Sequence, residues 1–428
     1  TTGVNIVQTP LPFYADIDGD SDIDLMFGSH YGDFILLENV GNATTPSFGN
    51  TGQTNPFSLT NNGNENEGDF ADIDNDGDLD IFTITATGNF QFYENTEAAS
   101  CSAVVTNNND SGAGSLREAV ANAGICGNIT FDPGMDGQTI TLSTGEIIIG
   151  QSLSIDASSL SSLIIDADSL SRIFNINAST ADVLLKGLTM QRGLSSGSGG
   201  AINNVGEITV ENCTINNSHS QTVGGGINND NSGVSNITNT TISNCTAQTN
   251  GGGIYSAGGG TINISQTNIT GNNAGNAGGG ILNNNGATVL IDNSLISGNQ
   301  SSGQGAGINN SGGASMTLST TTISNNTAGN NGGGMLNNSG AEAIIDQCLF
   351  SGNWSPTNGG GLASSGETSV TTTTFSDNNA TNGGGIAVIG DELELFHATV
   401  TQNNSGLKVF SGSVDLYQNI IAQNINYD

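Results

Sequence analysis

The chain has 428 residues, of which 63 are glycine, only 10% are charged and 5% are aromatic. Ordinary domains carry about 25% charged residues, so Asn, Thr, Ser and Gly must supply this surface. Five Lys and Arg against 39 Asp and Glu give a formal net charge of −34. This excludes a nucleic-acid partner and an anionic membrane surface, because phosphates are bound by clustered Lys and Arg. No apolar run reaches the ~18 residues of a membrane helix, so we expect no membrane span.

Residues 1–99 contain an acidic loop that occurs twice. Residues 14–25 (YADIDGDSDIDL) recur at 70–81 (FADIDNDGDLDI), and an apolar run follows each copy. Alternating carboxylates in a tight loop converge on one point, and hard oxygen ligands in that number suit Ca²⁺. Without a cation these carboxylates would repel one another. The expected calcium ligands are Asp16, Asp18, Asp20, Asp22 and Asp24 in the first loop and Asp72, Asp74, Asp76, Asp78 and Asp80 in the second.

These loops are not EF-hands, because no Glu closes them at position 12 and residues 81–84 predict a strand where an EF-hand has a helix. The pattern resembles the FG-GAP/VCBS repeat of integrin-like propellers, although Ser21 stands where the first loop would usually have glycine. The resemblance implies a small antiparallel β segment. Two copies are fewer than the four to eight blades of a propeller, so residues 1–99 are expected to form an incomplete one.

Residues 100–136 predict a cap with a single short helix. Ser115 and Glu118 form a capping box, and Gly124 supplies a stop. Capping accounts for Arg117 and Glu118 better than an active-site pair does. The stretch at 105–120 resembles the CSLREA-type entry motif of secreted bacterial β-helix proteins. One apolar face of the helix is formed by Leu116, Ala119, Val120 and Ala123.

Residues 137–428 contain a repeat of about 27 residues. Its glycine-rich anchor recurs as, for example, Gly251–Ile254, Gly278–Ile281 and Gly332–Met335. Apolar residues recur at two further positions in each period, so three short strands per turn are expected. This period and the short Val, Ile and Thr runs predict an all-β, right-handed parallel β-helix, in which neighbouring coils supply one another's hydrogen bonds. Propeller blades and leucine-rich repeats do not fit the pattern.

Polar columns accompany the apolar ones. One column is expected to stack its amides along the axis, and its members are Ser218, Cys245, Asn272, Asn299, Asn326, Asn353, Asn378, Asn403 and Asn424. A second Asn set follows the glycine anchor, and the glycines supply a positive φ or a close approach at a corner. The register predicts that Cys213, Cys245 and Cys348 are buried free thiols. Cys101 and Cys126 bracket the cap, and an extracellular setting favours a disulfide between them.

The paired signals Gly-Gly-Ala-Ile at 199–202 and Phe-x-x-Asn at 350–353 and 375–378 resemble the repeat of polymorphic outer-membrane proteins. That resemblance covers residues 185–425, with Ile in most coils where the family has Phe. It implies a secreted bacterial protein that is exposed at the cell surface and acts as an adhesin.

An enzyme is the main rival, since pectate lyases and polygalacturonases share this architecture. Lyases need Arg or Lys beside calcium, but the repeat has only Arg172, Lys186, Arg192 and Lys408 in different columns. Hydrolases need clustered carboxylates, and the best local group is Asp391, Glu392 and Glu394, which a solvated edge explains. The three histidines match no common column. An ice- or crystal-binding face is also disfavoured, because Asp interrupts the column Thr238, Ser265, Asp292, Ser319, Asp346 and Thr371.

The sequence therefore predicts an extracellular or cell-surface, adhesin-like binding protein that is stabilised by Ca²⁺ and has no catalytic residues. Its domains are the calcium-loop repeats at 1–99, the entry cap at 100–136 and the parallel β-helix at 137–428. Expected partners are a cell-surface or glycan ligand. The alternative is a structural subunit of an extracellular fibre, in which the chain binds copies of itself; a polysaccharide lyase or hydrolase is less favoured.

Overall fold

The computed structural model describes residues 12–15, 23–28, 33–39, 45–54, 66–71, 80–85, 90–93, 102–123, 127–230 and 232–425. The chain divides into two compact units. The first comprises Thr1–Ser102 with Gly124–Gly127, and the second comprises Ala103–Ala123 with Asn128–Asp428. Within the described residues, no helix is long and apolar enough to span a membrane.

The first unit contains two antiparallel sheets, one from each copy of the acidic repeat. In both copies the strands before and after the loop pair at equivalent residues, Ala15 with Asp24 and Ala71 with Asp80. Met26, Phe34 and Leu36 pack with Ile81 of the second copy in a small apolar core. The strands are β1 (Pro12–Ala15), β2 (Asp24–Gly28), β3 (Phe34–Asn39) and β4 (Phe48–Thr54) in one sheet, and β5 (Asn66–Ala71), β6 (Asp80–Thr85) and β7 (Phe90–Tyr93) in the other.

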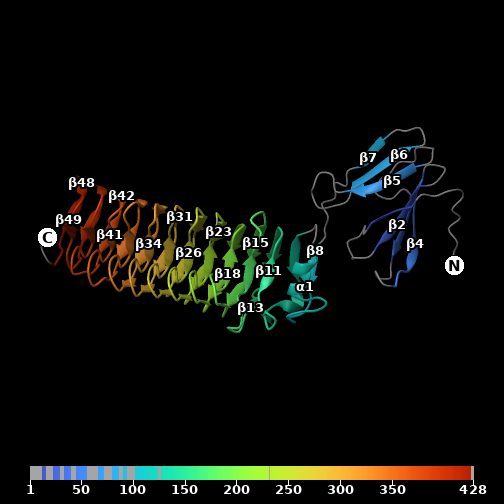
Figure 1. The fold of residues 1–428 in the computed structure, drawn as a ribbon, viewed down its shortest axis with the longest axis horizontal. Coiled ribbons are helices and arrows are strands. Elements are labelled where there is room, and N and C mark those ends of the chain that lie inside the picture. Colours follow the sequence, from blue (N-terminus) through green and yellow to red (C-terminus); the bar gives the residue numbers. More distant parts are fainter. Residues whose placement is uncertain are drawn as a thin grey trace. The chain divides into compact units, whose positions relative to one another are not determined.

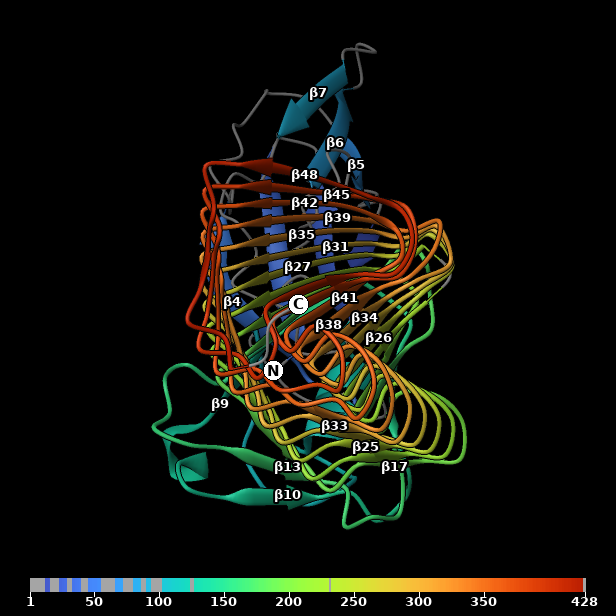
Figure 2. The ribbon, with the colours of Figure 1, turned by 90° about the vertical axis from the view of Figure 1, so that its left-hand side faces the viewer.

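The second unit is a stack of coils in which each strand pairs in parallel with the strand one coil further on (Figures 1 and 2). The sequence predicts this parallel β-helix correctly. Its longest sheet is built mainly from five-residue strands. These strands are β8 (Ser102–Val105), β9 (Asn128–Phe131), β12 (Leu153–Asp156), β15 (Asp182–Lys186), β19 (Glu207–Glu211), β23 (Val234–Thr238), β27 (Thr261–Ser265), β31 (Thr288–Asp292), β35 (Ser315–Ser319), β39 (Glu342–Asp346), β42 (Glu367–Thr371), β45 (Glu392–Phe396) and β48 (Ser413–Tyr417).

Two further sheets consist of three-residue strands. The first, which we call the threonine sheet because Thr is frequent on its outer side, contains β10 (Thr139–Thr141), β13 (Ile164–Asp166), β16 (Thr189–Gln191), β20 (Thr214–Asn216), β24 (Thr241–Ser243), β28 (Asn268–Thr270), β32 (Leu295–Ser297), β36 (Thr322–Ser324), β40 (Leu349–Ser351), β43 (Thr374–Ser376), β46 (Thr399–Thr401) and β49 (Ile420–Ala422). The second, which we call the glycine-anchor sheet because most of its strands follow a Gly triplet, contains β11 (Ile147–Ile149), β14 (Phe174–Ile176), β18 (Ile202–Asn204), β22 (Ile227–Asn229), β26 (Ile254–Ser256), β30 (Ile281–Asn283), β34 (Ile308–Asn310), β38 (Met335–Asn337), β41 (Leu362–Ser364), β44 (Ile386–Val388) and β47 (Leu407–Val409).

The expectation of three strands per coil is incomplete, because six middle coils have a fourth. Each added strand has only two residues, and its buried member is Ser or Ala, so no large apolar residue marks it in the sequence. These strands are β17 (Leu194–Ser195), β21 (His219–Ser220), β25 (Thr246–Ala247), β29 (Asn273–Ala274), β33 (Gln300–Ser301) and β37 (Thr327–Ala328).

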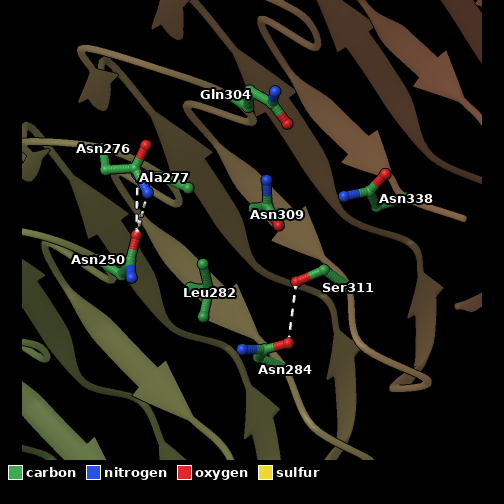
Figure 3. A pocket seen from close by; sticks show the side chains of 9 residues that line it. All are labelled: Asn250, Asn276, Ala277, Leu282, Asn284, Gln304, Asn309, Ser311 and Asn338. Carbon is green, nitrogen blue, oxygen red and sulfur yellow. Dashed lines mark hydrogen bonds between the residues drawn. The ribbon is translucent and has the colours of Figure 1, made fainter.

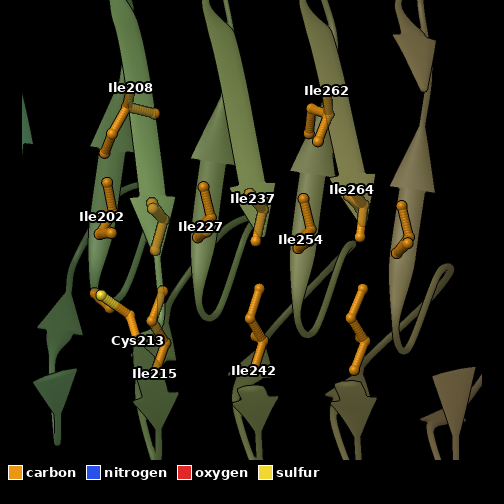
Figure 4. Close-up of a cluster of buried hydrophobic side chains, with 14 of the residues drawn as sticks. Ile202, Ile208, Cys213, Ile215, Ile227, Ile237, Ile242, Ile254, Ile262 and Ile264 are labelled. Carbon is orange, nitrogen blue, oxygen red and sulfur yellow. The ribbon is translucent and has the colours of Figure 1, made fainter. Parts of the chain in front are cut away.

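Isoleucine columns fill the interior of the coils. Ile227 and Ile254 of one sheet face Ile237 and Ile264 of another, and all four are almost fully buried (Figure 4). Further along, Phe350 and Phe375 occupy one column and stack with ring centroids 4.8 Å apart. Because consecutive coils place like residues one above another, one apolar core runs through the unit.

Amide ladders run through the stack, as the sequence predicts, although Oδ1 of Asn228, Oγ of Ser256 and Oδ1 of Asn283 are buried without a hydrogen-bond partner among the described residues. In the first Asn column, the backbone N–H and Nδ2 of Asn299 both donate to Oδ1 of Asn326, at 2.9 and 3.0 Å. In the second, Nδ2 of Asn283 donates to Oδ1 of Asn310 at 2.8 Å. Stacked amides of this kind offset the cost of burying polar groups only when the ladder is complete.

The glycine anchors have the two properties expected of them. Gly278 has a φ of +66°, which L side chains rarely adopt, and a Cβ on Gly279 would collide with the carbonyl oxygens of Gln300 and Ala306. The anchor therefore turns the chain and lets adjacent coils approach closely.

The cap contains α1 (Leu116–Ala121), whose N-cap Ser115 accepts a hydrogen bond from the backbone N–H of Glu118. The predicted apolar face is buried. The helix ends with Asn122 at its C-cap, and the predicted stop at Gly124 lies outside the described residues. The 3₁₀ helix η1 (Pro133–Met135) follows β9.

Candidate functional site

The predicted calcium ligands fall mostly outside the described residues: only Asp24 and Asp80 lie within them. Both carboxylates are almost completely buried at the first residue of the strand that follows their loop. Oδ1 of Asp24 accepts the backbone N–H of Asn39 at 2.8 Å, which ties β2 to the end of β3. Buried carboxylates at equivalent positions of both loops fit a hard cation, and their assignment to calcium stays a prediction.

Arg117 has a different role from the capping that the sequence favours. Its guanidinium forms an ion pair with Asp110 at 2.8 Å and donates to the backbone oxygens of Gly145 and Glu146. Asp110 also accepts hydrogen bonds from Ser143 and Thr144. Burial raises the pKa of Asp110, but the hydrogen bonds from Arg117, Thr144 and Ser143 outweigh burial and lower this pKa to about 2. The pair fastens the cap to the first coil.

The basic residues of the early coils are all held by carboxylates. Arg172 pairs with Glu146, and Lys186 lies 3.4 Å from Glu211. Arg192 contacts the nearly buried Asp166, whose pKa is lowered because hydrogen bonds from Arg192 and Gln191 outweigh the effect of burial. Three of the four Arg and Lys side chains of the repeat are therefore paired with carboxylates.

The best acidic cluster in the described coils includes a residue that sequence reasoning missed. Glu394 of β45 pairs in register with Asp415 of β48, and carboxylate oxygens of Glu392, Glu394 and Asp415 lie within 4.8 Å of one another. Asp415 can be assigned to this cluster only from the coil register, which places it beside Glu394. Three carboxylates on an open face supply fewer ligands than the six to eight that Ca²⁺ takes.

A polar recess lies on the outer side of the glycine-anchor sheet (Figure 3). Its volume is about 260 Å³, and none of its lining side chains is ionisable. We call it the amide recess, and define it by Asn250, Asn276, Ala277, Leu282, Asn284, Gln304, Asn309, Ser311 and Asn338.

Leu282 of β30 and Asn309 of β34 form the floor of the amide recess as successive members of one outward column. Asn309 is only 3% exposed, yet its side-chain amide forms no hydrogen bond with any other described residue. In Figure 3 no hydrogen bond joins this amide to another of the side chains drawn. The side-chain polar atoms of Asn309 are not among the fully enclosed unpaired atoms, so they face the open recess and are available to a ligand.

The recess exists because an amide ladder is interrupted. Along one wall, Asn358 donates to Asn331 at 2.9 Å and Asn382 donates to Asn358 at 3.0 Å. Two coils before Asn331, Ala277 occupies this column and leaves space where an amide would be. The sequence contains this break, but only the register shows that it lies beside Asn309.

The free cysteines agree with the predicted register. Cys213, Cys245 and Cys348 are buried and free, while Cys101 and Cys126 lie outside the described residues. Burial raises the pKa of Cys245 to about 12 and that of Cys213 to about 11. These thiols are therefore poor nucleophiles, because the thiolate is the reactive form.

The parallel sheets, the ladders and the helical cap define a parallel β-helix protein. Residues 252–425 match the family model described as right handed beta helix region. No curated protein matches the chain. Parallel β-helices include both enzymes and binding proteins, so the architecture does not decide function.

Proposed function

We propose that this chain is a non-catalytic, adhesin-like binding protein that works outside the cell or at its surface. The observation that carries the proposal is the amide recess, a preformed and uncharged recess in which the side-chain amide of Asn309 has no partner among the described residues. Preformed concave sites with a few convergent polar groups are typical of ligand binding. Its lining contains no carboxylate, imidazole, thiol or cationic group, which supports binding over catalysis.

The rival interpretation as a glycan lyase or hydrolase has weaker support. The early arginines are paired with carboxylates, and the acidic cluster of Glu392, Glu394 and Asp415 lies at a different place from the amide recess. Fold alone gives no activity. Binding without turnover is therefore the function that the described residues favour.

The test is to incubate the full chain with immobilised cellulose, mannan, pectin and extracellular-matrix films. We expect it to bind at least one of them and to release no reducing ends or unsaturated products. Turnover that disappears when Glu394 is replaced by Gln would overturn the non-catalytic assignment. Failure of the wild-type chain to bind any cell, matrix or polysaccharide surface would overturn the adhesin-like role.

Calcium binding at the two acidic loops is part of the proposal. The ligands are the ten aspartates of the sequence analysis, and the buried Asp24 and Asp80 lie at the end of each loop. Calcium chelation should loosen residues 1–99 and leave the coils folded, as measured by hydrogen exchange. A chelator effect confined to the coils, or no calcium uptake by calorimetry, would contradict it.

A fibre subunit remains the second candidate because of one observation. In the last described coil, Leu416 and Ile421 belong to core columns but are 51% and 40% exposed, whereas Leu395 and Val400 one coil earlier are fully buried. Another copy of the chain packed against these residues would begin a filament. Imaging of the native protein separates isolated rods from continuous filaments.

A further inference from the structure

We propose that the amide recess binds a neutral hexose unit of a glycan chain, and that Asn309 is its central hydrogen-bonding residue. This inference rests on the proposed binding function and names the ligand class of the same site. It follows from the chemistry of the lining side chains, from the hydrogen bonds that the backbone of the walls already makes, and from the size of the recess.

The lining selects for a neutral ligand that both donates and accepts hydrogen bonds. Asn309 and Gln304 have side-chain amides without partners among the described residues, and each amide offers N–H donors and an oxygen acceptor. A hydroxyl group also donates and accepts, so a polyhydroxylated ring can satisfy both ends of these amides. An anion would find no Arg or Lys in the recess, and a metal cation would find no carboxylate.

The wall backbone argues against an extended peptide as the ligand. Peptides that bind by strand addition need unpaired backbone N–H and C=O groups at a sheet edge. Here Ala277 O accepts from Gly251 N and Gln304 O accepts from Gly278 N, while Ser311 N donates to Asn283 O. These backbone groups already connect adjacent coils, so the walls offer mainly side-chain amides and the hydroxyl of Ser311.

Size and shape favour one ring of a longer chain. The volume of about 260 Å³ is just below the ~300–1,000 Å³ of pockets for drug-sized ligands. Leu282 provides an apolar floor patch beside the Asn309 amide, which suits a ring with C–H groups on one face and hydroxyls at its edge. The recess opens at the surface, so the rest of the glycan can continue outside it.

Asn309→Leu is the decisive variant, because the next members of its outward column are Leu282 on one side and Leu336 on the other. Leucine is therefore already accommodated at this position of the coil. Asn268→Leu is the matched control: Asn268 is exposed on the threonine sheet, and its column neighbour in the next coil is Leu295. A second variant, Ala277→Asn, restores the residue found at Asn250 and Asn331 and fills the recess.

The experiment measures saturation-transfer NMR and calorimetric binding of the full chain with cellotetraose, mannotetraose and chitotetraose. Trigalacturonate and a neutral Ser/Thr-rich tetrapeptide represent the two competing ligand classes, acidic glycans and peptides. We expect at least one neutral oligosaccharide to bind, Asn309→Leu and Ala277→Asn to weaken it more than tenfold, and Asn268→Leu to leave it within twofold. Thermal unfolding of each variant confirms that it is folded.

Three outcomes would overturn the inference: binding of trigalacturonate or the peptide instead, binding of none of the oligosaccharides, or equal losses in Asn309→Leu and Asn268→Leu. If any of these occurs while the wild-type chain and Asn309→Leu both still adhere to the immobilised surfaces, the adhesin-like role stands and the ligand assignment fails. If the wild-type chain adheres to nothing, the proposed function itself fails.

Discussion

The early and the later coils of the β-helix are held together by different chemistry. Between residues 103 and 196, ion pairs such as Arg172 with Glu146 and Arg192 with Asp166 connect neighbouring coils. From about residue 197 to 405, Asn and Thr ladders do this, and no ion pair joins two described residues of these coils. Four of the five Lys and Arg residues of the chain lie in the early part.

The difference follows from which residues occupy the columns. Asn recurs at one position of successive later coils, and its amides stay in contact although the spacing is 27 residues from Asn326 to Asn353 and falls to 21 residues from Asn403 to Asn424. Between the early coils, Arg172 and Arg192 reach carboxylates of the preceding coil instead. Ladders thus require an aligned Asn in each coil, and they tolerate a change in the number of residues per coil.

The largest expected effect comes from placing a charge in the ladder. Asn326→Asp removes the donor that serves Ile296 O and Asn353 Oδ1 and puts a carboxylate against both acceptors. A buried charge without a partner costs roughly 3–5 kcal/mol. Urea unfolding followed by circular dichroism should show this loss of unfolding free energy. Asn268→Asp, which places the same charge on the exposed face, is the control and should change the unfolding free energy little. A small loss at Asn326 would mean that the ladder contributes little to stability.

A smaller loss is expected from the ion-paired region. Arg192→Met removes the guanidinium from Asp166 but leaves the hydrogen bonds from Gln191 and the backbone N–H of Asp168. Arg192 is partly exposed and solvent screens its contacts, so we expect a smaller loss in urea unfolding than Asn326→Asp gives. If Arg192→Met lost as much unfolding free energy as Asn326→Asp, ion pairs and ladders would contribute equally, and the distinction between the early and later coils would not hold.

Acid should weaken the cap before it weakens the ladders. The pKa of Asp110 is about 2 in the folded chain and near 3.8 when unperturbed, so its contribution is complete above about pH 4 and is lost as the pH falls toward 2. The lowering corresponds to about 2 kcal/mol. The protection of residues 116–121 against hydrogen exchange, relative to the intrinsic exchange rate at each pH, should therefore fall between pH 4 and pH 2. Asp110→Asn should abolish that pH dependence, while Asn ladders have no group that titrates there.

The smallest effect sharpens the comparison within the later coils. Asn309→Leu removes an amide without partners among the described residues, so we expect the free energy of unfolding to change by less than about 1 kcal/mol. Urea unfolding of Asn309→Leu beside Asn326→Leu tests this, because the second variant breaks four side-chain hydrogen bonds. Equal losses would show that Asn309 is a structural residue.

The sequence alone determines the architecture of the coils. A 27-residue period, the glycine anchors and the aligned Ile and Asn positions predict the parallel β-helix, the free cysteines and the capping of α1, because each depends on spacing along one chain. The regular repeat converts sequence distance into position along the axis, so the spacing of Cys245 and Asn272 is enough to place both in one column.

Only the tertiary structure decided which residues meet across columns. Ala277, Asn309 and Asn338 lie in different columns and coils, and nothing in their spacing shows that they line one recess. The partner of Arg117 was hidden for the same reason, whereas Asp415 and Glu394 are successive members of one column. A column follows from periodicity, but the outward faces of separate columns come together through the bends between strands, which depend on packing of the whole coil.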